Sequence, residues 1–159
     1  MVTKHEHFDA NIILGALLPG KEKFRNYCKN YLTRFFVDIS GGISVITLGE
    51  IHRKIYVTFD KGDSKTTDAR NDALQFIDRL VLRRNIKVFQ VGHEDIKLYQ
   101  KLRTIENRSD APELISLAIA IRNGADVFVT ADSALFDSEE LKKHVNDNYG
   151  ISIKKPEKA

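Results

Sequence analysis

The chain has 159 residues, of which 42% are hydrophobic and 30% are charged, and its formal net charge is only +3. This length and balance suit one domain with a substantial apolar core, and the small net charge does not by itself indicate nucleic-acid binding. The single cysteine, Cys28, excludes an internal disulfide bond and fits a reducing compartment. No apolar run approaches membrane-spanning length and no signal peptide is visible, so we expect a cytoplasmic protein without a membrane partner.

Short apolar runs alternate with longer helical patterns along the chain. We expect strands at residues 5–9, 43–46, 86–91, 126–130 and 151–153. We expect helices at 11–18, 21–36, 47–56, from 68 onwards, 93–106, 112–123 and from 138 onwards, with a long loop at 61–67. Thr47 and Asp68 are the expected caps of their helices. This alternation predicts an α/β fold, a three-layer α/β/α sandwich with a mostly parallel central sheet.

Four acidic residues stand at the edges of apolar elements: Asp9, Glu50, Glu113 and Asp132. Asp9 ends the first strand and Asp132 follows the strand at 126–130, and ligands bind outside the carboxyl ends of parallel strands. Glu50 and Glu113 lie early in helices that are expected to begin at the same rim. Clustered carboxylates cannot all stay ionised without a cation, and a hard ion such as Mg²⁺ or Mn²⁺ prefers oxygen ligands. The sequence therefore predicts a divalent-metal site for phosphodiester chemistry.

Each of these acids also has a structural interpretation. Asp9 and Asp132 could cap the helical turns that follow them, and Glu50 and Glu113 lie where a helix dipole favours negative charge. Asp110, one turn before Glu113, competes with it for the third position. Their expected meeting at one rim favours the metal site over four separate structural roles.

Three fragments of the chain, FDANIIL, ITLGEI and ELISLAIAIRNGADVFVTAD, resemble the motifs of PIN-domain ribonucleases in order and spacing. The resemblance, which extends to VapC-type toxins, implies one PIN-like domain over residues 1–159. It assigns the metal positions to Asp9, Glu50, Glu113 and Asp132. Glu113 stands where the family usually has Asp, and the first strand is more polar than the family's.

Further roles also follow from this resemblance. Asn11, Thr130 and Asp110 would support the metal ligands from the surrounding shell. The activity implied is that of a Mg²⁺- or Mn²⁺-dependent endoribonuclease, in which a metal-activated water cuts RNA to leave a 5′-phosphate and a 3′-hydroxyl. Many members are toxins of toxin–antitoxin pairs and form homodimers, so an antitoxin protein and a second copy are the implied partners.

Other interpretations stay open at this point. A PIN-like module that binds RNA or a protein without cleaving is the main alternative to the enzyme. His5, His7 and Asp9 alternate along the first strand and would make a zinc site with one more ligand. A haloacid-dehalogenase-type phosphatase needs a second Asp where this chain has Asn11. The basic pairs could meet phosphates or be solvated surface groups; these are Arg83-Arg84, Lys142-Lys143 and Lys154-Lys155.

Overall fold

A five-stranded parallel sheet lies between two layers of helices in the computed structural model, which describes residues 4–37, 39–60, 62–82 and 86–158. The strands are β1 (His5–Phe8), β2 (Ser40–Ser44), β3 (Ile86–Phe89), β4 (Val127–Val129) and β5 (Ser152–Lys154). The helices are α1 (Ala10–Leu17), α2 (Glu22–Thr33), α3 (Val45–Thr58), α4 (Ser64–Leu82), α5 (His93–Arg103), α6 (Ala111–Arg122), α7 (Ser133–Phe136) and α8 (Glu139–Tyr149), with short 3-10 turns at Arg34–Phe36 and Pro156–Lys158. The expected three-layer α/β fold is confirmed.

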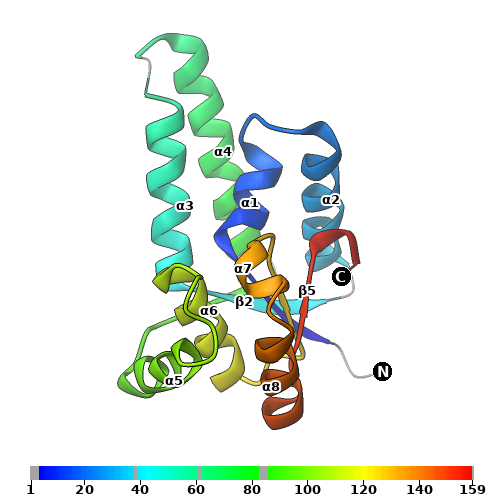
Figure 1. The fold of residues 1–159 in the computed structure, drawn as a ribbon. Coiled ribbons are helices and arrows are strands. Elements are labelled where there is room, and N and C mark those ends of the chain that lie inside the picture. The colour runs from blue at the N-terminus through cyan, green and yellow to red at the C-terminus, as the bar shows by residue number, and fades with distance from the viewer. Residues whose placement is uncertain (1–3, 38, 61, 83–85, 159) are drawn as a thin grey trace.

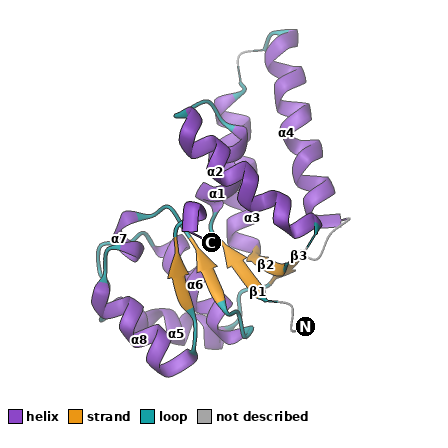
Figure 2. Ribbon diagram, turned by 90° about the vertical axis from the view of Figure 1, so that its right-hand side faces the viewer, coloured by secondary structure: helices purple, strands orange, loops and turns teal. Residues whose placement is uncertain are grey.

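The strand order is β3-β2-β1-β4-β5, so β1 is the central strand and all carboxyl ends lie at one rim (Figure 2). Figure 1 shows α1 to α4 on one side of the sheet and α5, α6 and α8 on the other. A hydrophobic core lies on each side of the sheet, and successive side chains of β4 point into different cores. Val127 and Val129 pack with α1 to α4, whereas Phe128 packs with α5, α6 and α8. The helix α6 carries six buried residues and is covered by neighbours on most sides, as its apolar sequence predicts.

The polar first strand is buried because tertiary partners satisfy its side chains. Glu6 is 2% exposed and accepts a hydrogen bond from the Tyr31 hydroxyl at 2.9 Å. His7 is 1% exposed and stacks on Phe89, with 5.2 Å between ring centroids. A side chain at Gly42 would clash with both rings, so the glycine makes this stack possible.

Several predicted boundaries were wrong, for local reasons. The helix α3 begins at Val45 because the Ser44 hydroxyl accepts a hydrogen bond from the Thr47 amide at 3.0 Å, so Ser44 and not Thr47 is the cap. The loop expected at 61–67 is shorter, since Asp63 accepts a hydrogen bond from the Thr66 amide and α4 starts at Ser64. The helix α7 was not predicted. No described helix is both long and apolar enough to span a bilayer.

Candidate functional site

Asp9 leaves the central strand directly into the first turn of α1. One carboxylate oxygen, Oδ1, accepts a hydrogen bond from the Ala10 amide at 3.3 Å, and the other, Oδ2, accepts one from the Thr130 hydroxyl at 2.9 Å. The side chain is 1% exposed. Asp9 is therefore a helix cap, as the structural interpretation predicts, but also a carboxylate buried at the carboxyl rim of the sheet.

Thr130 joins Asp9 to the segment that follows β4. Its hydroxyl oxygen accepts a hydrogen bond from the Asp132 amide at 3.0 Å while its proton goes to Asp9. Asp132 caps α7 by accepting from the Ala134 amide at 2.9 Å. Asn11 closes the same junction, because its Oδ1 accepts from the Ala131 amide at 3.1 Å. These bonds hold the ends of β1 and β4 in one arrangement.

Three buried hydroxyl groups tie together the helices that carry the other two acids. The side-chain oxygens of Ser44, Thr47 and Ser116 are 3.0 Å from one another in each pairing. Glu50 lies one turn after Thr47 on α3, and Glu113 lies one turn before Ser116 on α6. The sequence analysis missed this hydroxyl cluster, although an isolated serine in the apolar helix α6 was a signal for it.

The negative charges of the four acids act on one another. The pKa of Asp9 is raised from 3.8 to about 8, first by burial and then by the charge of Glu113. The hydrogen bond from Thr130 opposes this rise in pKa, while Glu50 and Asp132 add to it. Four carboxylates from separate elements therefore lie within electrostatic range at one rim.

Glu113 is poised differently from its neighbour Asp110. The pKa of Glu113 is raised to about 6, first by burial and then by the charges of Glu50, Asp110 and Asp132, while a hydrogen bond from its own backbone amide opposes the rise. Within the described part of the chain, the Glu113 Oε2 atom is buried and has no hydrogen-bond partner. Asp110 is exposed, and its side chain makes no capping bond to α6. A buried oxygen without a donor can be satisfied by a water molecule or by a cation.

The acids do not form a ready coordination shell. Across the described ranges, no three His, Cys, Asp or Glu side chains stand close enough together to hold a metal ion as they are. In two of the carboxylates, those of Asp9 and Asp132, one oxygen already accepts a hydrogen bond from a backbone amide at the start of a helix. The donor set still suits a hard divalent cation, because it consists only of oxygen atoms and includes the orphaned oxygen of Glu113.

The alternative zinc site is likewise not assembled. His5 and His7 do lie side by side, with 3.1 Å between their Nε2 atoms. Asp9, the third residue of that prediction, instead bonds Thr130 and the first amide of α1. The two histidines hydrogen-bond each other as part of the packing above the sheet.

The predicted basic pairs mostly serve local contacts. Lys142 pairs with Glu139 and Lys143 with Asp147, each at 2.7 Å. These ion pairs favour the interpretation of the two lysines as surface groups over a role in binding phosphate. The ammonium groups of Lys142 and Lys155 lie 4.6 and 4.4 Å from the centre of the Phe136 ring. The pair Arg83-Arg84 lies outside the described residues.

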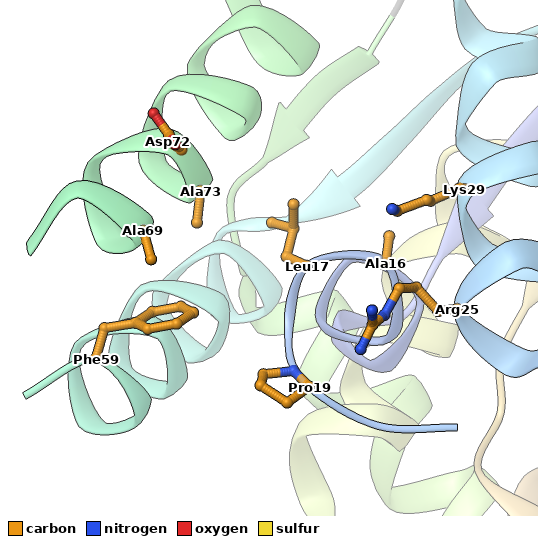
Figure 3. Close-up of a pocket in the computed structure, with 9 residues that line it drawn as sticks. All are labelled: Ala16, Leu17, Pro19, Arg25, Lys29, Phe59, Ala69, Asp72 and Ala73. Atoms are coloured by element: carbon orange, nitrogen blue, oxygen red, sulfur yellow. The ribbon is translucent and has the colours of Figure 1, made fainter. Parts of the chain in front are cut away.

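A cavity of about 360 Å³ opens away from the acids, between α1, α2 and α4 (Figure 3). Figure 3 shows Arg25 and Lys29 on one side of this space and the residues of α4 on the other. The lining residues are Ala16, Leu17, Pro19, Arg25, Lys29, Phe59, Ala69, Asp72 and Ala73. None of the four rim carboxylates takes part, so this space is separate from the acidic site.

Comparison with known proteins identifies structural neighbours only. No family model matches the chain, and no curated protein matches it. Among solved structures, VapBC2 of Rickettsia felis bound to a promoter DNA fragment matches with a TM-score of 0.62 at 15% identity, covering 95% of this chain and 98% of that chain. FitAcB of Neisseria gonorrhoeae matches with 0.64 at 16% identity, covering 95% and 97%. A toxin–antitoxin complex of Klebsiella pneumoniae matches with 0.56 at 16% identity, covering 92% and 94%.

These neighbours correct the family assignment made from the sequence fragments. At 15–16% identity the likeness shows a shared fold alone, and the names describe complexes of two partner proteins. The assignment of the chain to the PIN-domain ribonucleases, and to the VapC-type toxins within them, is therefore corrected to a shared fold. The chain has a PIN-like three-layer fold that it shares with these three structures, one of which is described as a toxin–antitoxin complex.

Proposed function

We propose that the chain is a divalent-metal-dependent hydrolase of RNA phosphodiester bonds. The observation that carries this proposal is the surrounding of Asp9, a buried carboxylate whose pKa of about 8 reflects burial and the charges of Glu113, Glu50 and Asp132. Carboxylates whose pKa is raised by burial and by neighbouring like charges are concentrated at functional sites. A bound Mg²⁺ or Mn²⁺ would relieve the mutual repulsion.

Asp9, Glu50, Glu113 and Asp132 would hold the ion, directly or through water. The ion would supply a nucleophile at neutral pH and neutralise charge on the phosphate. Thr130 keeps Asp9 oriented by its hydrogen bond, and its second bond sets the position of Asp132. Without the ion, Asp9 keeps its proton up to about pH 8, and binding of the ion would require that proton to leave. The affinity for the ion should therefore rise with pH.

A polyanionic substrate fits the distribution of charge. The chain carries a net charge of +3 although four of its acids gather at one rim, so the rest of its surface is more basic than the net value indicates. RNA is the substrate proposed. The fold shared with toxin–antitoxin complexes supports a further proposal, that a partner protein holds the chain inactive and that two copies pair in the cytoplasm.

The test is cleavage of a single-stranded RNA by purified protein with Mg²⁺ or Mn²⁺. We expect cleavage that EDTA abolishes and that Asp9→Asn lowers by at least about 100-fold, since this variant removes a charged ligand. Glu6→Gln is the matched control, because it also neutralises a buried acid of the first strand and leaves the rim intact. Cleavage that survives in Asp9→Asn would overturn the proposed site.

A second candidate, a module that binds RNA without cutting it, is favoured by one observation. As the side chains stand in the described ranges, no three potential ligands form a metal group. This candidate predicts RNA that is bound but intact with either metal, and calorimetry that detects no binding of Mn²⁺. The proposed hydrolase predicts instead that Mn²⁺ binds and that the RNA is cleaved.

A further inference from the structure

The loop between α5 and α6 holds an arginine in a fixed place. Glu106 is 3% exposed, and its Oε1 accepts hydrogen bonds from the Arg108 amide at 2.7 Å and from Arg108 Nε at 3.3 Å. Its Oε2 lies 3.4 Å from Arg108 Nη2. Arg103 steadies the same loop by donating to the Ser109 carbonyl. The buried carboxylate of Glu106 thus holds the Arg108 guanidinium by hydrogen bonds.

This arginine lies in the segment that leads into the acidic end of α6. The loop leads directly into α6, which carries Glu113 in its first turn. The side chain of Ser138, in the segment that follows Asp132 and α7, also lies beside Glu106. The pKa of Arg108 is raised, first by the hydrogen bonds that it donates to Glu106 and by the charge of Glu106, and then by the charges of Asp137 and Asp132. Arg108 therefore lies just before the first turn of α6, which carries Glu113, and is within electrostatic range of Asp132.

The guanidinium keeps donors available to a ligand. It carries five N–H groups, and Glu106 engages those of Nε and Nη2. The side chain of Arg108 remains 63% exposed. A planar fork of this kind matches the oxygens of a phosphate, and holding it in advance reduces the conformational entropy lost on binding.

We propose that Arg108 binds an RNA phosphate next to the phosphate that is cleaved. The rim repels a polyanion, and a single fixed cation beside it both offsets that repulsion and sets the register of the strand. The inference rests on the proposed RNA substrate, but it concerns binding, and binding can be measured apart from cleavage. Arg108 is a substrate-contacting residue in this proposal and takes no part in proton transfer.

The experiment compares two arginines that are each paired with a buried acid. Arg122, at the far end of α6, lies 3.5 Å from Asp95, whose side chain is 8% exposed. Arg108→Gln and Arg122→Gln each remove one charge and keep hydrogen-bond donors for the paired acid. Binding of a labelled single-stranded RNA is measured in EDTA over a range of salt concentrations. We expect Arg108→Gln to weaken binding roughly fivefold and to reduce the salt slope by about 0.7, the value for one phosphate contact on a single strand.

Arg122→Gln should bind RNA like the wild type. With Mn²⁺, Arg108→Gln should raise KM and leave kcat within about twofold, a split that a merely structural loss would not produce. Equal salt slopes for the two variants would overturn the inference, as would a wild-type protein that does not bind RNA. RNA binding that depends on Arg108 without any cleavage would support the phosphate contact of Arg108 and reject the proposed hydrolase.

Discussion

Two buried acids lie three residues apart at the centre of the sheet, and their surroundings differ. Glu6 is 2% exposed, receives the Tyr31 hydroxyl at 2.9 Å and lies 3.9 Å from the guanidinium of Arg34. Asp9 is 1% exposed, receives the Thr130 hydroxyl, and has other carboxylates as its charged neighbours. Glu6 is balanced by the cation of Arg34, whereas among the described residues the charges that act on Asp9 are those of other carboxylates.

The comparison shows that burial alone does not mark a functional carboxylate. A buried charge with a cationic partner contributes to the fold, because removing the partner would leave it uncompensated. A buried carboxylate among like charges lowers stability unless something binds. On this reasoning Glu6 belongs to the architecture and Asp9 to the chemistry.

The largest expected effect comes from removing the hydroxyl that serves Asp9. Thr130→Val should weaken Mn²⁺ binding by roughly 10- to 100-fold, because it frees both Asp9 and Asp132 from their common partner. Calorimetric titration measures this, and Thr130→Ser should restore the affinity. Tyr31→Phe removes the corresponding hydroxyl from Glu6 and should leave the affinity for Mn²⁺ unchanged; a loss of affinity in this variant would break the comparison.

The third acidic position offers a sharper distinction. Glu113→Gln should weaken Mn²⁺ binding by about tenfold, and Asp110→Asn should weaken it less, because Glu113 carries the orphaned buried oxygen and Asp110 is exposed. The same titration compares them. The reverse order would transfer the ligand role to Asp110.

Stability should respond in the opposite sense to metal binding. Tyr31→Phe should lower the free energy of unfolding by about 1–2 kcal/mol, because it removes a donor from a buried carboxylate. Asp9→Asn should not lower it in EDTA above about pH 8, since there the substitution removes a repelled charge. Urea unfolding of both variants checks this, and a strongly destabilised Asp9→Asn would show that Asp9 is mainly structural.

A smaller effect is expected in the pH dependence of stability without metal. The folded pKa of Asp9, about 8, lies above its usual 3.8, so the folded protein binds this proton more tightly and loses stability as pH rises toward 8. His7 has the opposite effect on stability, because its pKa is lowered to about 3 in the folded protein. This effect is confined to pH values below 6.5, the usual pKa of histidine, and so lies outside the range tested. The melting temperature in EDTA should therefore fall between pH 6.5 and 8.5, and the fall should be smaller in Asp9→Asn. A flat wild-type profile would contradict the raised pKa.

The sequence alone was enough for the fold class and for most elements. Alternating apolar runs and helical periods determine a parallel α/β sheet, and the apolar sequence of α6 requires its burial. Local capping decided the boundaries that the prediction missed, as at Ser44 and Asp63, because several polar residues near a helix start compete for its first amides. Topology also placed Asp9 and Asp132 at one rim, since both follow parallel strands.

Only the tertiary structure decided how those acids are held. The hydroxyl that bonds Asp9 comes from Thr130, more than a hundred residues away, and the cluster of Ser44, Thr47 and Ser116 joins helices that are not neighbours in the chain. Whether a buried carboxylate meets a cation, as Glu6 does, or other carboxylates, as Asp9 does, depends on such long-range contacts. Periodicity and spacing report the local chain, whereas the electrostatic environment of a side chain is a property of the packed whole.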